Sequence, residues 1–280
     1  MIYKKLKNEI IIIDKSQFNP THILECGQVF CFKKDEEGYS VFPQDKFAKI
    51  IEKADGYHII TKDVNFFENY FDLETDYLQI KRSLKKFELL KEPLNFGYGI
   101  RILKQDLFET LISFIISANN NIKRIKLILD NLREYFQKEN NGKIFPTYLQ
   151  LSNQNEQFFK NMGCGYRAKY LVNVLKEIKP AILKDWEKLN TNELQKKLIS
   201  LSGVGPKVAD CILLFGYGKK DVFPVDTWIN QMYNKYYSKL DNRQKIRENL
   251  IMQFKNLSGY AQQYLFYYQR SFIHKWNYGS

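Results

Sequence analysis

The sequence predicts an α+β fold, in which an N-terminal antiparallel β-sheet domain with a few helices precedes an all-helical domain. Three observations lead to this prediction. Short runs of β-branched and aromatic residues fill the first part of the chain, apolar residues recur at helical spacing from Asp63 onward, and breakers cluster at Pro93–Gly99. We therefore place the sheet domain at residues 1–95 and the helical domain at residues 96–280.

Five short strands are predicted in the sheet domain. They cover residues 9–13, 29–34, 39–42, 47–51 and 57–61, and turns that contain Gly, Pro or Asp separate several of them. The connections are too short for crossover helices, so we expect the strands to pair antiparallel.

The later helices carry start signals of their own. Asp106 with Glu109, and Asn190 with Glu193, each form the pattern of a capping box ahead of apolar residues at helical spacing. An aromatic-rich segment over residues 257–272 predicts a closing helix.

Charge favours a polyanionic partner, and nucleic acid is the first choice. Lys and Arg number 43 against 31 Asp and Glu, which gives a formal net charge of +12. Only eight of the 43 are Arg, and a chain rich in Lys, Asn and Ile also arises from biased codon usage, so charge alone is a modest argument. No run approaches the roughly 18 apolar residues of a membrane span. The N-terminus lacks a signal-peptide pattern.

Cysteine and histidine usage predicts neither a metal site nor a disulfide framework. Cys26, Cys31, Cys164 and Cys211 form no C-x-x-C pair, and the three histidines are dispersed. We therefore expect no cofactor, no membrane partner and a reducing cytoplasm, with the nucleoid as the location if the cell is prokaryotic.

Residues 201–210 are the most informative segment. A helix ends near the start of this segment, Gly203, Val204 and Gly205 make a tight turn, and Pro206 suits the first position of a new helix. Backbone amides of the turn and the helix N-terminus can bind phosphate. This pattern predicts a helix–hairpin–helix that holds one nucleic-acid strand by its backbone. The alternatives are an ordinary helical connection and a non-catalytic DNA-binding module.

Lys207 and Asp226 are the candidate catalytic residues. Lys207 would be the second residue of the new helix, where the dipole disfavours a cation and favours the neutral, nucleophilic amine. A phosphate-contacting lysine is the alternative. Asp226 is a good N-cap for the helix that follows it, so capping alone is the simpler interpretation. A carboxylate held by helix amides, expected to stay ionised, can also stabilise positive charge that develops nearby.

The hairpin, Lys207 and Asp226 resemble the helix–hairpin–helix DNA glycosylase superfamily. In that superfamily the lysine attacks the sugar and the aspartate assists. The resemblance therefore implies a bifunctional enzyme that removes a base and then nicks the strand. The absence of a clustered cysteine set argues against the iron–sulfur branches of the superfamily.

Further segments are similar to motifs of the 8-oxoguanine DNA glycosylase family, and this resemblance covers nearly the whole chain. The segments are Cys26-Gly27-Gln28-Val29-Phe30, Phe114 with the Asn119–Arg124 run Asn-Asn-Asn-Ile-Lys-Arg, Gly165-Tyr166-Arg167-Ala168, and Gly259–Phe266. Two positions depart from the pattern. Trp228 stands where eukaryotic members usually carry histidine, and Cys31 replaces a commonly basic residue, so the contacts made there are open.

The resemblance implies a lesion-binding set. The carbonyl of Gly27 would accept the N7–H that only the oxidised purine carries, whereas unoxidised guanine would place two lone pairs face to face. Gln262 would meet the pairing edge of the base, and Phe266 and Cys211 would form the two walls of its pocket. The set is completed by Phe114 and Pro224. Taken alone, Cys211 and Phe266 would be assigned to the core.

The same resemblance implies contacts to the base opposite the lesion. Asn119 and Arg124 would contact the orphaned base, Asn120 would fill the space left in the duplex, Tyr166 would wedge beside the orphan, and Arg167 would read cytosine. Alone, the asparagines would form a polar helix cap and Arg167 would contact a phosphate.

These observations predict a monomeric base excision repair enzyme that flips 8-oxoguanine out of double-stranded DNA, excises it through a lysine Schiff base and then nicks the strand by β-elimination. Two alternatives stay open: a glycosylase for another damaged purine, and a non-catalytic DNA-binding protein. The first would differ in its lesion preference. The second would bind DNA with a steep salt dependence and form no product.

Overall fold

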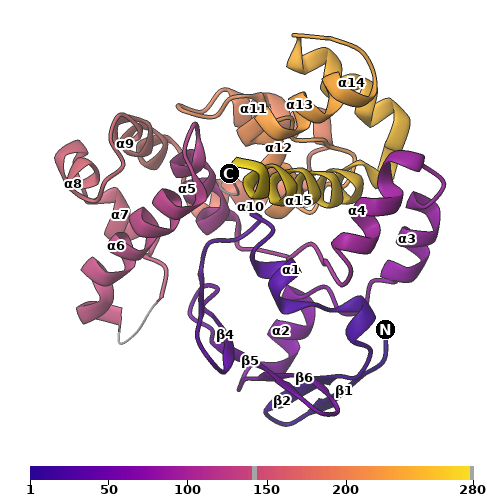
Figure 1. Ribbon diagram of the computed structural model, residues 1–280. Coiled ribbons are helices and arrows are strands. Elements are labelled where there is room, and N and C mark those ends of the chain that lie inside the picture. The colour runs from indigo at the N-terminus through magenta and orange to yellow at the C-terminus, as the bar shows by residue number, and fades with distance from the viewer. Residues whose placement is uncertain (141–143, 278–280) are drawn as a thin grey trace.

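The computed structural model describes the backbone of residues 1–140 and 144–277, and the side chains of residues 1–136 and 144–271 (Figure 1). A six-stranded antiparallel sheet carries the order β1-β2-β6-β5-β4-β3. Its strands are β1 (Tyr3–Leu6), β2 (Glu9–Ile12), β3 (Phe32–Lys34), β4 (Gly38–Val41), β5 (Ala48–Lys53) and β6 (Gly56–Ile60). The predicted antiparallel sheet is therefore confirmed.

Register places one row of isoleucines on the buried face of the sheet. Ile10 pairs with Ile59, and Ile59 pairs with Ile50, so the three side chains cross β2, β6 and β5 as neighbours. All three are almost completely buried. Cross-strand β-branched pairs of this kind stabilise the sheet and pin its register.

The sheet differs from the prediction at two places. Strand β1 was not predicted, because its sequence Tyr-Lys-Lys-Leu lacks an apolar run. The predicted strand at 29–34 pairs only over its last three residues. Gln28 explains this difference, because its buried amide bonds the carbonyls of Ile23 and Arg101 and the amide of Leu103. The chain after Gln28 is thereby held against the segment that leads to the helical part.

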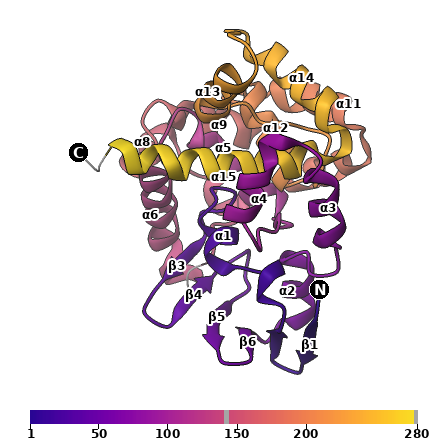
Figure 2. The ribbon, with the colours of Figure 1, turned by 45° about the vertical axis from the view of Figure 1, so that its right-hand side comes forward.

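Helices, joined by loops and short 3-10 turns, make up most of the rest of the described chain (Figure 2). They are α1 (Pro20–Leu24), α2 (Val64–Tyr70), α3 (Tyr77–Leu84), α4 (Lys91–Phe96), α5 (Leu107–Ser117), α6 (Ile122–Asn140), α7 (Tyr148–Ser152), α8 (Glu156–Asn161), α9 (Arg167–Glu177), α10 (Pro180–Asp185), α11 (Thr191–Ile199), α12 (Pro206–Phe215), α13 (Thr227–Tyr236), α14 (Arg243–Phe254) and α15 (Ser258–Asn277). None of those in the described ranges is both long and apolar enough to cross a bilayer.

Two capping boxes were predicted, and one of them is correct. Asn190 and Glu193 exchange both bonds at the start of α11. Asp106 caps α5 through the amide of Glu109, but the Glu109 side chain does not return the bond. It instead accepts from the Cys31 thiol and lies 3.4 Å from the amide of Gln44, because burial against the sheet domain directs it away from the helix end.

The junction of the two predicted domains is packed rather than open. Helix α4 crosses the predicted boundary after residue 95, and its neighbour α15 runs between the sheet and helices α13 and α14 (Figures 1 and 2). Arg101 is fully buried there and donates to the carbonyls of Gln17, Phe71, Asp72 and Thr75. One continuous apolar core extends through both parts. The division at residue 95 stays a prediction.

Candidate active site

The hairpin between α11 and α12 has the geometry that its sequence predicts. Gly203 adopts φ +80°, and a Cβ there would lie 2.6 Å from Cδ2 of Tyr170. Gly205 is the N-cap of α12, Pro206 is the first helical residue and Lys207 the second. The prediction for this segment is therefore confirmed at the level of backbone structure.

A buried ion pair fixes α12 against its neighbours. The carboxylate of Asp210 is fully buried and accepts from Nε and Nη2 of Arg247 on α14. Gln195 on α11 donates to the same carboxylate at 2.7 Å. Asp210 lies three residues after Lys207, so this network anchors the part of α12 from which Lys207 projects.

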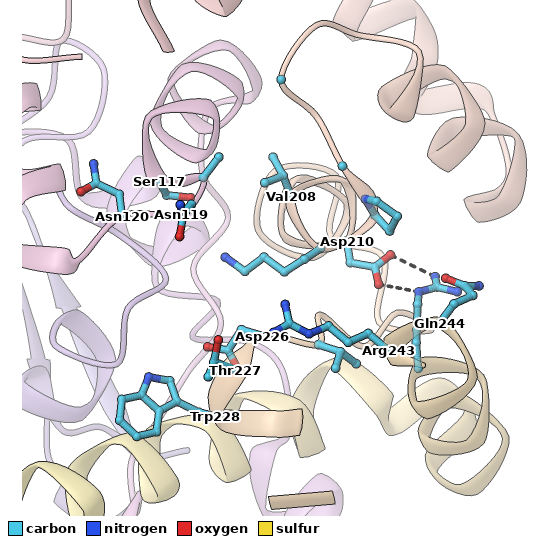
Figure 3. Close-up of a pocket in the computed structure, with 17 residues that line it drawn as sticks. Ser117, Asn119, Asn120, Val208, Asp210, Asp226, Thr227, Trp228, Arg243 and Gln244 are labelled. Carbon is cyan, nitrogen blue, oxygen red and sulfur yellow. Dashed lines mark hydrogen bonds and ion pairs between the residues drawn. The ribbon is translucent and has the colours of Figure 1, made fainter. Parts of the chain in front are cut away.

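Lys207 and Asp226 line two cavities that share part of their walls. The first cavity, of about 560 Å³, is bounded by the hairpin, the loop that follows α5 and the start of α14. In Figure 3, Asn119 and Asn120 lie on one side of this cavity, and Asp226 and Arg243 lie on the other. The second cavity, of about 900 Å³, extends toward the N-terminal part of the chain. The residues common to both cavities are Ser117, Asn120, Lys207, Asp226 and Trp228.

The amine of Lys207 lies among aromatic and uncharged groups as well as beside a carboxylate. Its Nζ is 5.8 Å from the ring centre of Phe114, which stacks on Phe215. The thiol of Cys211, one helical turn further on, interacts with the amine. Burial raises the pKa of Cys211 to about 11, so this thiol is neutral at pH 7 and does not hold Lys207 in an ion pair.

Asp226 caps α13 as predicted, and its Oδ1 accepts from the amide of Ile229 at 2.9 Å. Burial raises the pKa of this carboxyl group. The helix amides, the positive charge of Lys207 and that of Arg243 oppose the shift without cancelling it. We expect a carboxylate held by helix amides to stay ionised, and burial opposes this effect at Asp226. The sequence does not reveal this burial, because capping is a local feature whereas burial depends on the whole fold.

The raised pKa of Asp226 predicts a pH dependence. If the ionised carboxylate supports the reaction, the single-turnover rate falls as the pH decreases through the pKa of Asp226, and this fall begins at a higher pH than for an exposed aspartate. Rate measurements from pH 4 to 9 on one DNA substrate would show this acid limb. The Asp226→Asn variant should lack it, and an unchanged acid limb in that variant would assign it to another group.

The predicted lesion-binding residues divide into two groups. Gly27, Phe114 and Phe266 line the 900 Å³ cavity. Cys211, Gln262 and Pro224 are buried and do not line it. Nε2 of Gln262 is 3.5 Å from the carbonyl oxygen of Pro224, and its Oε1 is buried with no partner among the described residues. An amide left unsatisfied at this position can still bond an incoming polar group.

The predicted opposite-base residues all line a third cavity of about 410 Å³, which shares Asn119 and Asn120 with the first cavity. The five residues are Asn119, Asn120, Arg124, Tyr166 and Arg167. Arg167 is buried and donates to the carbonyl oxygens of Ala118 and Asn119 at 2.7 and 2.6 Å. Tyr166 also donates to Ala118, and Asn119 adopts φ +49°. Arg167 thus clamps the loop after α5, and the donors of its guanidinium that these bonds leave over are the ones available to a base.

The two departures from the family pattern have different surroundings. Trp228 lines both cavities that contain Lys207, so it is part of the site. Cys31 lines neither cavity and donates its thiol hydrogen to Glu109. Arg133 on α6 is buried and close enough to interact with this thiol, so a basic group lies near the position although residue 31 is not basic.

Sequence reasoning missed cationic residues that line the two cavities, among them Arg270 and Arg243. Arg270 lines the 900 Å³ cavity, and Arg243 lines the 560 Å³ cavity. Arg270 follows Phe266 by four residues on the same helix, so helical spacing could have revealed it. Arg243 is the first residue of α14 and approaches Lys207 only through the tertiary fold, which leaves no local signal. In the described part of the chain, no His, Cys, Asp or Glu residues gather in a group that could hold a metal.

The two hairpin glycines predict a matched pair of variants. Gly203→Ala should destabilise the fold by at least roughly 1–2 kcal/mol for the left-handed backbone alone, and the clash with Tyr170 adds to this cost. Gly205→Ala should cost less, about 1 kcal/mol or below, because φ is −85°, a Cβ would meet nothing within 4 Å, and only the poorer N-cap preference of alanine counts against it. Thermal unfolding would check both. Equal losses of stability would contradict this reading of the hairpin.

Comparison with known proteins agrees with this geometry. The chain matches the model of the 8-oxoguanine DNA glycosylase N-terminal domain over residues 10–111, and that of the HhH-GPD superfamily of base excision DNA repair proteins over residues 112–256. A crystal structure of Clostridium acetobutylicum 8-oxoguanine glycosylase/lyase, in complex with double-stranded DNA containing cytosine opposite 8-oxoguanine, has a TM-score of 0.89 and 37% identity. It covers 98% of this chain and 99% of its own.

Two curated relatives are also similar to this chain in sequence. The N-glycosylase/DNA lyase of Saccharomyces cerevisiae is 30% identical over 280 residues, which cover 85% of this chain and 73% of the relative. A probable N-glycosylase/DNA lyase of Methanothermobacter thermautotrophicus is 30% identical and covers 72% of this chain and 73% of its own length.

The antiparallel sheet, the hairpin and the lysine and aspartate at one cavity define a helix–hairpin–helix protein of the base excision repair class. Within that class, the chain belongs to the 8-oxoguanine DNA glycosylase family.

Proposed function

We propose that this chain excises 8-oxoguanine from duplex DNA and then cleaves the abasic strand. The observation that carries the proposal is the cavity on which Lys207 and Asp226 meet Gly27, Phe114 and Phe266. A nucleophile, a carboxylate, a backbone acceptor and aromatic walls are what base excision from an extruded nucleotide requires.

The reaction begins with Lys207. Its neutral amine attacks C1′ of the extruded nucleotide, the glycosidic bond breaks, and the base leaves with the bonding electrons. Asp226 stabilises the positive charge that develops on the sugar, since its carboxylate lines the same cavity. The attacking amine loses a proton, which balances the charge of the departing base. The C1′–O4′ bond then breaks, O4′ takes up a proton, and the opened sugar carries a Schiff base between C1′ and Lys207. This Schiff base makes the C2′ proton acidic, and loss of that proton expels the 3′ phosphate by β-elimination.

Duplex DNA is held by backbone contacts in this proposal. Gly203, Val204 and Gly205, together with the start of α12, would bind a phosphate, and the net charge of +12 supports such contacts. The residues around the 410 Å³ cavity would contact the base opposite the lesion. We expect the protein to act as a monomer in the cytoplasm or nucleoid, where its DNA substrate lies.

Single-turnover cleavage of 8-oxoguanine duplexes with each of the four opposing bases tests the proposal. Release of the free base followed by strand cleavage is expected, and preference for cytosine would support the assigned opposite-base contacts. Binding without product under any condition would indicate the non-catalytic alternative. Stronger excision of alkylated or ring-opened purines would indicate a glycosylase for another lesion.

Gln262→Ala tests the assigned lesion contact. The buried amide of Gln262 has an unsatisfied Oε1, so its loss should remove hydrogen bonds to the base rather than apolar packing. We expect 8-oxoguanine excision to fall by roughly 10-fold to 100-fold. Cleavage at a preformed abasic site, which offers no base to the amide, should fall much less. An equal loss on both substrates would contradict a base contact.

A further inference from the structure

Helix α15 carries three residues at four-residue intervals on the side where two of them line the 900 Å³ cavity. They are Gln262, Phe266 and Arg270, and this spacing places them on one face of the helix. Phe266 and Arg270 line the 900 Å³ cavity together with Gly27, Lys207 and other residues. The first two members of the row have assigned roles in the proposed function, whereas Arg270 has none.

Among the described residues, only one of the two terminal nitrogens of the Arg270 guanidinium has a hydrogen-bond partner. Its Nη2 donates to the carbonyl oxygen of Glu25, at the end of α1. Its Nη1 is buried and has no hydrogen-bond partner among the described residues. The guanidinium carbon lies 5.3 Å from the ring centre of Phe266 and 5.7 Å from that of Tyr267, so aromatic rings flank the cation. A buried N–H of a charged group without a partner is costly, which favours a ligand acceptor at this position.

Nη1 lies beside the glycine that is assigned to N7 of the lesion. A Cβ on Gly27 would be 2.9 Å from Nη1 and 3.0 Å from the Phe266 ring, so only glycine lets the three groups converge. On 8-oxoguanine, the carbonyl groups at C8 and C6 flank the N7–C5 edge. A donor next to a group that bonds N7–H can therefore reach one of these two oxygens.

We propose that Arg270 is a specificity-determining residue, whose Nη1 donates a hydrogen bond to a carbonyl oxygen that flanks N7 of the extruded purine. This inference rests on the proposed function, since it deepens the recognition of the same base. A guanidinium carries only donors, so it favours a purine with a carbonyl at that place and opposes an amino group, as adenine carries at C6.

The experiment compares base excision with cleavage at a preformed abasic site, both under single-turnover conditions. Arg270→Met keeps the unbranched apolar stem of the side chain but removes the guanidinium and its donors. We expect the ratio of the two rates to fall by about tenfold or more. Arg82→Met is the matched control, because it removes the same charge from an exposed position on α3. The control should keep the ratio of the unaltered protein.

A structural role gives a different result. If Arg270 only holds the Glu25 carbonyl, excision and abasic cleavage change by the same factor, and the inference is overturned. Arg270→Lys provides a second variant in case the Met variant fails to fold, since its ammonium can still reach Glu25 but lacks the forked donors. A lower ratio in the folded Lys variant supports the proposal, and an unchanged ratio overturns it.

Binding to modified duplexes separates the two oxygens. In a Lys207→Gln background, which removes the nucleophile, Arg270→Met should weaken binding to an 8-oxoguanine duplex relative to undamaged DNA. An equal loss with 8-oxoadenine assigns the bond to the C8 oxygen, whereas a loss confined to 8-oxoguanine assigns it to the C6 oxygen. No loss on either lesion overturns the inference. If the unaltered protein fails to excise 8-oxoguanine, the proposed function itself fails, and this outcome is distinct from any result with Arg270.

Discussion

Lys207→Gln is expected to abolish the covalent complex that sodium borohydride traps on 8-oxoguanine DNA. Glutamine keeps a polar side chain at the second position of α12 but has no nucleophilic amine, so neither the Schiff base nor its reduced product can form. We expect excision to fall on the order of 10⁴-fold or more. Denaturing gels after borohydride treatment would measure the trapped species, and single-turnover assays would measure the rate.

The control uses a second lysine, whose amine is also partly neutral but which lies outside the two cavities that contain Lys207. Burial lowers the pKa of Lys220 to about 8, so this residue also offers a partly neutral amine at neutral pH. It lines neither cavity that contains Lys207. Lys220→Gln should therefore still be trapped. Trapping that survives Lys207→Gln and is lost in Lys220→Gln would assign the nucleophile to Lys220 and refute the mechanism proposed above.

Asp226→Asn is expected to reduce excision by about 10²-fold to 10³-fold without loss of stability. Asparagine caps helices about as well as aspartate, so the bond from Ile229 to residue 226 can be kept while the charge is removed. This variant therefore separates two roles of Asp226, namely the stabilisation of positive charge on the sugar and the capping of α13. Asp226→Ala would remove both and should also cost about 1 kcal/mol of stability.

Asp226→Asn is also expected to change the Tm of the protein in a defined direction. Because burial raises the pKa of Asp226 above that of the unfolded chain, the ionised carboxylate weakens the folded state at neutral pH. This penalty disappears as the pH falls through the raised pKa toward the unfolded value. The variant should therefore have a higher Tm than the unaltered protein at pH 7, and the difference should shrink in acid.

A matched variant tests whether any Asp-to-Asn change at a cap has this effect. Asp76 caps α3 through the amides of Leu78 and Gln79, and it lines none of the cavities of the site. Asp76→Asn should keep normal excision. If Asp226→Asn excises 8-oxoguanine at the normal rate, the charge of Asp226 has no part in the reaction, and its role is reduced to capping.

Several features of the site were predictable because their signals are local. The paired glycines and Pro206 specify the turn and the start of α12, and this places Lys207 at the second helical position. Asp226 precedes a helix at a typical capping position. The Asn190–Glu193 box lies within one turn of chain. Such patterns depend on backbone geometry over a few residues, so no knowledge of distant neighbours is needed.

Other features depended on residues far apart in the chain. Glu109 has the pattern of a capping-box residue, yet tertiary burial turns its side chain toward Cys31. Arg167, taken alone, is expected to contact a phosphate, yet it donates to the carbonyls of Ala118 and Asn119. In both cases the energy of satisfying buried polar groups exceeds the local preference.

The sequence by itself determined the fold class, the hairpin and the positions of Lys207 and Asp226 at the starts of two helices, since each follows from short-range propensities. Only the tertiary structure decided that Gly27 meets Arg270 across the cavity, and that burial raises the pKa of Asp226. The reason is physical. Cavity shape, desolvation and unpaired donors arise from packing between segments that lie hundreds of residues apart, and such packing leaves no periodic pattern in any one segment.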